Sequence, residues 1–162
     1  MTVDLIIEDE RWTKTGLPQI AERACTAALG FVSLDPVFWD VALLACDDAR
    51  ITELNAEFRG KPKPTNVLSW PSQDRAPTEP GGVPQQPDPD LDPELGDLAI
   101  AYETCLREAE SAGRAFDHHV AHLIVHGTLH LLGYDHESEP DADRMESLEV
   151  EILASLGVEN PY

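Results

Sequence analysis

Residues 120–136, VAHLIVHGTLHLLGYDH, combine the apolar spacing of a helix with four of the chain's six histidines. Residues four apart on a helix share one face, so His126 and His130 direct their imidazoles to the same point. Gly133 can adopt the left-handed conformation that turns the chain after a helix, and this turn returns His136 to that point. The stretch therefore predicts a helix and a tight turn that together form a three-histidine metal site.

These histidines match the ligand set of a catalytic zinc ion. Three neutral imidazoles leave one position of a tetrahedral zinc open, whereas structural zinc sites usually close with four protein ligands. The spacing matches the metzincin pattern HExxHxxGxxH except that Gly127 stands where the proteases have glutamate. We predict one Zn²⁺ per chain, bound by His126, His130 and His136. Ordinary packing is favoured for the remaining histidines, which are His118, His119 and His122. His122 lies one helical turn before His126 and could also support that ligand.

Gly127 changes the chemistry that such a site can perform. In zinc proteases the glutamate takes a proton from the metal-bound water and passes it to the leaving amine, which glycine cannot do. Zinc still lowers the pKa of its bound water toward about 7, so attack by that water remains feasible. A phosphodiester suits this site because its alkoxide leaving group needs less help, and in RNA the 2′-hydroxyl could attack instead. We also expect the glycine to leave room over the metal.

The rest of the chain alternates between strand and helix patterns. Strand patterns occupy residues 2–9, 37–47, 65–70 and 95–102, and helix patterns occupy 17–29, 103–112, 118–132, the segment from a cap at Asp48 to Gly60, and the residues after Pro140. This order favours an α+β or mixed α/β fold, with a small, mainly four-stranded sheet packed with about five helices. The closing helices would hold the metzincin-like histidine site over the sheet.

Residues 71–95 are rich in proline and acidic residues, which predicts an irregular surface loop. Such a loop could gate the cleft, touch a partner or be an insertion without a role. A chain of 162 residues is long enough to bury one core, so we expect a single domain over residues 1–162.

The charge of the chain limits its partners. It has 31 acidic and 11 basic residues, and a net charge of −20 repels nucleic acid and anionic lipid headgroups. Arg59, Lys61 and Lys63 nevertheless fall within five residues, and such a basic island can act locally because salt screens surface charges beyond about 8–10 Å. A guanidinium can bind phosphate oxygens in a bidentate manner. Taken alone, Arg59 is better explained as a surface residue favoured by a helix dipole.

The sequence also indicates a compartment. No apolar run approaches the roughly 18 residues of a transmembrane helix, and MTVDLIIEDERW (1–12) lacks the basic start of a secretory signal. The three widely spaced cysteines are expected to be reduced thiols: Cys25, Cys46 and Cys105. We therefore expect a cytoplasmic protein without a membrane partner.

Four segments resemble the signatures of one known family. The first is HGTLHLLGYDH (126–136), together with the VAHLIV that precedes it. The others are LNAEFRGKPKPTNVLSWP (54–71), LGDLAI (95–100) and MESLEVEILASLG (145–157). Together they closely resemble the YbeY family of bacterial endoribonucleases, and the resemblance spans roughly residues 40–157.

The resemblance implies a metal-dependent endoribonuclease for single-stranded RNA, acting at the 3′ end of the small-subunit ribosomal RNA and in ribosome quality control. It implies zinc on the three histidines of the motif and a functional arginine in LNxxFRGK, which is Arg59. Lys61 is a weaker candidate for binding substrate, and Asn66 and Ser69 could line the site or serve only structural hydrogen bonds. The implied partners are RNA and the ribosome, and DNA is not expected.

Two other functions remain open from the residues. The metzincin-like spacing is compatible with a metal-dependent hydrolase of peptide or amide bonds, although the glycine at position 127 counts against it. A noncatalytic ribosome-associated factor could use zinc only to hold its helices, and a fourth protein ligand would support that function.

Overall fold

The sheet has three parallel strands and one antiparallel edge strand. A computed structural model describes residues 2–162, and within them four strands form one sheet in the order β1-β2-β4-β3. The strands are β1 Thr2–Ile7, β2 Asp40–Cys46, β3 Val67–Pro71 and β4 Glu94–Ala101. β1, β2 and β4 run parallel, and β3 pairs antiparallel with β4 at the edge of the sheet. The expected four-stranded sheet is confirmed.

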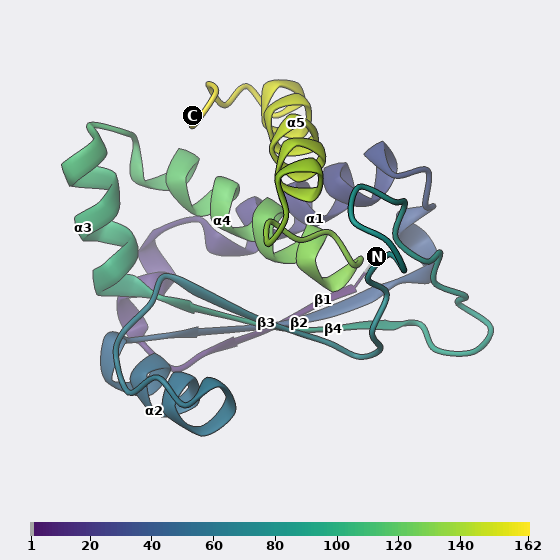
Figure 1. The fold of residues 1–162 in the computed structure, drawn as a ribbon. Helices are drawn as coiled ribbons and strands as arrows, with labels where there is room; N and C mark the ends of the chain where they lie inside the picture. Colours follow the sequence, from purple (N-terminus) through teal and green to yellow (C-terminus); the bar gives the residue numbers. More distant parts are fainter. Residues whose placement is uncertain (1) are drawn as a thin grey trace.

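Five α-helices accompany the sheet in the part of the chain that the structure describes. They are α1 Leu17–Phe31, α2 Asp48–Arg59, α3 Tyr102–Ala112, α4 Phe116–Leu131 and α5 Glu139–Ser155. Figure 1 shows α1, α4 and α5 on one side of the sheet and α2 on the other. The predicted mixed α/β class and the order of elements are therefore confirmed. None of the helices described combines the length and apolarity that crossing a bilayer requires.

The main core lies between the sheet and the layer of α1, α4 and α5. α4 is buried along most of its length because its apolar residues meet the sheet on one side and the other helices on the other. A smaller apolar cluster between the sheet and α2 includes Ile51, Leu54 and Leu68. Burial of α4 explains why most of its remaining residues are apolar, and it fixes the position of the histidines that the helix carries.

The cap of α2 differs from the expectation. Asp47, not Asp48, is the N-cap, and its carboxylate accepts a hydrogen bond from the Arg50 N–H at 2.8 Å. Asp48 instead accepts from the backbone N–H of Thr104 at 3.1 Å and from its hydroxyl at 2.7 Å. The prediction was wrong because both aspartates suit a cap, and only the packing of α3 against α2 decides between them. At the other end, Gly60 takes a left-handed φ of +68° and ends α2 as expected.

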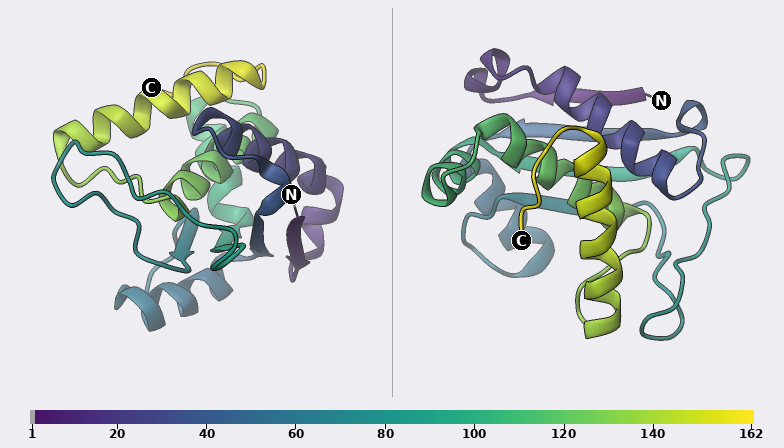
Figure 2. Two further views of the ribbon diagram at one scale, coloured as in Figure 1. Left: turned by 90° about the vertical axis from the view of Figure 1, so that its right-hand side faces the viewer. Right: turned by 90° about the horizontal axis from the view of Figure 1, so that it is seen from above.

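The segment 72–93 between β3 and β4 is irregular and lies within the predicted loop 71–95, whose first and last residues belong to the two strands. The segment packs against the ends of two helices. Arg75 is buried, and its guanidinium donates to the carbonyl of Leu131 at the end of α4 at 2.8 Å. Farther along, the Gly81 N–H donates to the Asp141 carboxylate at 2.8 Å, and Arg144 donates to the Gly81 carbonyl at 2.9 Å. Figure 2 shows the segment reaching the start of α5. The loop is therefore anchored at both α4 and α5.

Candidate metal centre

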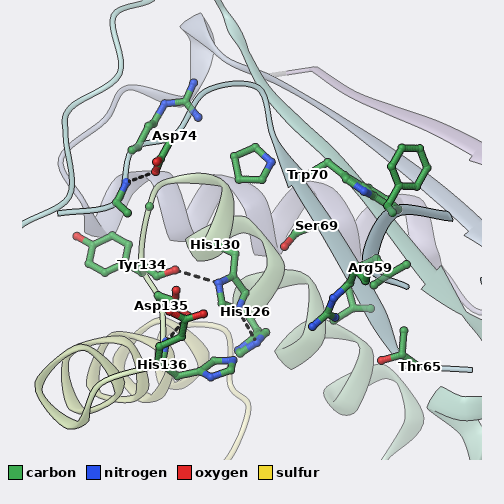
Figure 3. A pocket seen from close by; sticks show the side chains of 18 of the residues that line it. Arg59, Thr65, Ser69, Trp70, Asp74, His126, His130, Tyr134, Asp135 and His136 are labelled. Atoms are coloured by element: carbon green, nitrogen blue, oxygen red, sulfur yellow. Dashed lines mark hydrogen bonds between the residues drawn. The ribbon is translucent and has the colours of Figure 1, made fainter. Parts of the chain in front are cut away.

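His126, His130 and His136 converge at the end of α4. The ligand atoms of the three side chains lie within 4.8 Å of one another, and the Nε2 atoms of His126 and His130 are 3.0 Å apart. Gly133 has a φ of +99°, which bends the chain after α4 and returns His136 to the two histidines of the helix. Figure 3 shows the three imidazoles meeting at one side of a cavity. The predicted convergence is therefore present in the structure.

The two helical imidazoles are held in the orientation that a metal ion needs. Nδ1 of His126 donates to the Glu149 carboxylate at 2.6 Å, and Nδ1 of His130 donates to the Tyr134 carbonyl at 2.9 Å. Each Nδ1 therefore carries the proton, and each Nε2 presents a lone pair to the centre of the cluster. Lone pairs that face each other across a short gap repel unless a cation lies between them. The donor set is thus suited to a metal ion.

The spacing of the imidazoles also suits zinc. Two nitrogens bound to a tetrahedral zinc, each at about 2.0–2.1 Å, are separated by about 3.3–3.4 Å. The three ligand atoms lie within 4.8 Å of one another, so small rotations of the side chains bring them to this geometry. His136 is the exposed member of the group, and its backbone N–H donates to the Asp135 carboxylate at 2.6 Å. The residues present therefore fit a metal ion, although they do not identify it.

Burial adjusts the protonation of this centre. Burial first, and then the neighbouring His126 and His136, lower the pKa of His130 to about 4. His130 therefore stays neutral near pH 7, as a ligand must. Burial also acts to raise the pKa of Glu149, but hydrogen bonds from His122, His126 and Tyr162 outweigh this effect and lower it to about 2. The carboxylate beside His126 is therefore ionised.

Gly127 faces the sheet rather than the metal position. A Cβ added at this glycine would lie 2.8 Å from Cδ2 of Leu98 and 3.5 Å from Cγ2 of Val67. The expectation that the glycine leaves room over the metal is therefore wrong, because the space on that side of α4 belongs to the helix–sheet contact. Glycine allows α4 to approach β3 and β4 closely. Any larger side chain at this position would displace the side chain of Leu98.

A cavity of about 610 Å³ opens beside the histidines. Its lining residues come from the end of α2, from β3 and the residues before it, from the loop after β3, and from α4 and the turn that follows it: Phe58, Arg59, Thr65, Asn66, Val67, Leu68, Ser69, Trp70, Pro71, Asp74, Arg75, Ala76, His126, His130, Gly133, Tyr134, Asp135, His136 and Glu137. The cavity unites Arg59 with histidines that follow it by 67 to 77 positions. Arg59 extends toward the imidazoles from the opposite side (Figure 3).

The basic residues near the cavity differ in their placement. Arg59 is the last residue of α2, and its guanidinium joins none of the ion pairs among residues 2–162. By contrast, Arg50 on the same helix is paired with Glu8 and Glu53. Lys61 is exposed on the following loop and lies outside the ring of lining residues. Of the predicted basic island, the structure therefore brings Arg59 but not Lys61 to the cavity wall.

Two residues that support the centre, Glu149 and Tyr162, were not predicted from the sequence. Glu149 is wholly buried on α5, and the Tyr162 hydroxyl donates to it at 2.5 Å. A signal was present, since Glu149 lies four residues after Met145 and three before Ile152, at an apolar position of the helix. His122, for which packing was favoured, has its Nε2 3.5 Å from the same carboxylate. It therefore contacts the residue that holds a candidate ligand.

The fold and this site together define a class of protein. A mixed α/β sheet supports one helix and its closing turn, which present three imidazoles and leave an open side toward a cavity with an arginine in its wall. This is the arrangement of a metalloprotein with an open coordination position.

Comparisons with known proteins identify the family. Residues 5–157 match the family described as Endoribonuclease YbeY. The protein of that description from Ruegeria pomeroyi is 57% identical over 164 residues, which cover 100% of this chain and 98% of the relative. Its counterpart from Jannaschia sp. is 56% identical, with 100% of both chains covered. The chain therefore belongs to the YbeY endoribonuclease family.

A solved structure supports the fold alone. A protein from Thermotoga maritima, determined in solution, matches this chain with a TM-score of 0.56 and 20% sequence identity. The match covers 96% of this chain and 92% of that protein.

Proposed function

We propose that this chain is a zinc-dependent endoribonuclease for single-stranded RNA, acting at the 3′ end of the small-subunit ribosomal RNA and in ribosome quality control. Its membership of the YbeY family supports the endoribonuclease activity, which is the hydrolysis of phosphodiester bonds in RNA. The observation that carries the mechanism is that Arg59 and the three histidines line one cavity. We further propose that residues 1–162 form a single domain with this activity.

The three histidines would hold the metal ion. When bound, zinc supplies a Lewis acid for a phosphoryl oxygen and lowers the pKa of a bound water. In the described part of the chain, the group that could hold an ion consists of His126, His130 and His136 without a fourth protein ligand. This argues against the noncatalytic alternative, because a purely structural zinc site usually has four ligands.

Arg59 would bind the phosphate that is cleaved. Its guanidinium can donate two parallel hydrogen bonds to the non-bridging oxygens, and these bonds strengthen as negative charge builds up during attack. The attacking oxygen comes from water or from the 2′-hydroxyl of the RNA. Ser69 lines the same wall and offers its hydroxyl as a further hydrogen-bond donor to the RNA backbone, whereas the Asn66 amide already donates to the Glu108 carboxylate at 3.0 Å. The chain thus positions the phosphate and stabilises its developing negative charge without the glutamate that the proteases use.

The acidic surface explains why a partner is needed. Asp74, Asp135 and Glu137 line the cavity, and the chain carries a net charge of −20, so long RNA is repelled. We infer that the ribosome holds the RNA end at the cavity and thereby offsets this repulsion. Lys61 would then contact RNA outside the cavity, two residues beyond Arg59 at the end of α2.

The test compares two arginine variants of the same helix on a labelled single-stranded RNA. Arg59→Ala should lower the cleavage rate by about 10²–10³, the usual effect of removing a group that stabilises transition-state charge. Arg50→Ala is the matched control, because Arg50 lies on α2 away from the cavity, and it should cleave normally. Both variants should retain one zinc ion per chain, whereas His130→Ala should lose it. Unchanged cleavage by Arg59→Ala would refute the role of Arg59.

The same preparations decide between the substrate classes. A casein substrate should remain intact with and without added zinc, and casein cleavage with intact RNA would favour the peptide hydrolase instead. In cells that lack the protein, mapping of small-subunit ribosomal RNA should reveal unprocessed 3′ ends. Normal ends would refute the assignment to ribosomal RNA maturation.

A further inference from the structure

Glu149 is a carboxylate buried within a helix interface. Its side chain has no exposed surface, and it lies on α5 between the apolar residues Met145 and Ile152. An ionised carboxylate in such a place is stable only if its oxygens are hydrogen-bonded. Both oxygens have partners here, since Oε1 accepts from Nδ1 of His126 at 2.6 Å and Oε2 accepts from the Tyr162 hydroxyl at 2.5 Å.

The contact with His126 determines how this imidazole faces the metal position. A carboxylate oxygen can only accept, so Nδ1 of His126 carries the proton and Nε2 remains available, 3.0 Å from Nε2 of His130. His130 is oriented in the same way, but by a neutral carbonyl, that of Tyr134. A carboxylate partner also raises the basicity of the imidazole toward a metal, which a carbonyl does less strongly. His126 is therefore the helical ligand with the charged support.

Tyr162 connects the segment after α5 with this carboxylate. The segment leaves α5 and passes over α4 (Figure 1), where Glu159 accepts from Nδ1 of His118 at 2.9 Å. The Tyr162 ring then packs edge-on against His122, with ring centres 5.7 Å apart. The residue is 61% exposed, yet its hydroxyl reaches the buried Oε2 of Glu149. The hydroxyl thus closes the side of the carboxylate that His126 leaves open.

We propose that Glu149 is a positioning residue for the metal ligand His126, and that Tyr162 holds Glu149 in place, so that the segment after α5 contributes to metal affinity. Neither residue touches the substrate; both act through the imidazole of His126. The inference rests on the proposed metal binding by the three histidines.

Zinc affinity of the full chain, measured by competition with a chromophoric chelator, tests this role. Replacement of a partner of this kind typically lowers metal affinity by about 10- to 100-fold. Glu149→Leu removes the acceptor at similar volume and should lower the zinc affinity by about 100-fold. Glu149→Gln keeps a neutral acceptor and should lower the zinc affinity by about 10-fold. Tyr162→Phe, a change at an exposed ring, should give a smaller loss. Glu151→Gln, at an exposed position of the same helix, is the control and should bind zinc like the wild type.

A spectroscopic measurement separates positioning from mere loss of structure. The hydrogen-bonded Nδ1–H of His126 should give a downfield proton resonance in the wild type and in Glu149→Gln, and this resonance should be absent in Glu149→Leu. Unchanged zinc affinity in Glu149→Gln and Glu149→Leu would overturn the proposal, and an equal loss in Glu151→Gln would show a general charge effect and overturn it too. Unchanged affinity in Tyr162→Phe would overturn the role of Tyr162. A wild type that binds no zinc would instead refute the metal site itself.

Discussion

Gly133 is the residue whose replacement most directly tests how the metal centre is built. It lies three residues after His130 and three before His136, with a φ of +99°. An added Cβ would lie 2.3 Å from the carbonyl oxygen of Arg75, the loop residue that also binds the end of α4. Gly133→Ala therefore combines backbone strain with a collision against another backbone segment.

The two costs can be separated. A left-handed conformation costs a non-glycine residue about 1–2 kcal/mol. Relief of the collision requires the loop or the turn to move, and overpacking of this kind costs about 1–3 kcal/mol more. We expect Gly133→Ala to lower the free energy of unfolding by a total of about 2–5 kcal/mol. Gly113→Ala is the matched control, since Gly113 ends α3 with a φ of +65° and its added Cβ meets nothing within 4 Å.

Urea unfolding of the zinc-free proteins measures the difference. Gly113→Ala should lose only the strain, about 1–2 kcal/mol, and so should Gly157→Ala, whose φ is +76° with nothing near its Cβ. Zinc affinity should fall in Gly133→Ala alone, because only this turn carries His136 to the other ligands. Equal losses of stability in all three variants would refute the argument that contact with the Arg75 backbone fixes the turn.

Two further predictions concern the same helix. Gly127→Glu, which restores the protease glutamate, should lower stability by at least about 3 kcal/mol because it forces a carboxylate between α4 and the sheet. It should not hydrolyse casein, and a stable, casein-cleaving variant would contradict this placement of Gly127. In the zinc-free protein, the pKa of His130 is about 4 in the folded state, against an ordinary value of 6.5 that applies to the unfolded chain. Between these two values the unfolded chain binds more protons, so the free energy of unfolding decreases as the pH falls from 6.5 to 4. The stability difference between wild type and His130→Ala should therefore shrink from pH 7 to pH 4, by at most about 3 kcal/mol; a constant difference would contradict the shift.

The features that could be predicted from the sequence are those that depend on neighbouring residues along the chain. Helical spacing places His126 and His130 on one face, and glycines at positions 60 and 133 end helices because they accept left-handed backbone. The alternation of strand and helix patterns similarly predicted the mixed α/β fold, and the proline-rich composition predicted the irregular segment after β3. These properties follow from local periodicity and local backbone preference.

Contacts between residues far apart in the sequence became known only from the three-dimensional structure. It placed Arg59 in the wall of the histidine cavity and Lys61 outside it, although both lie in one basic island. It also placed Gly127 in the contact with Leu98 on the sheet. The comparison with the protease motif had suggested instead that this glycine lies over the metal. Glu149 gave a local signal, an acid in an apolar helix face, but its partner His126 lies on another helix. Such pairings depend on how α2, α4 and α5 pack around the sheet, and spacing along the chain does not encode that packing.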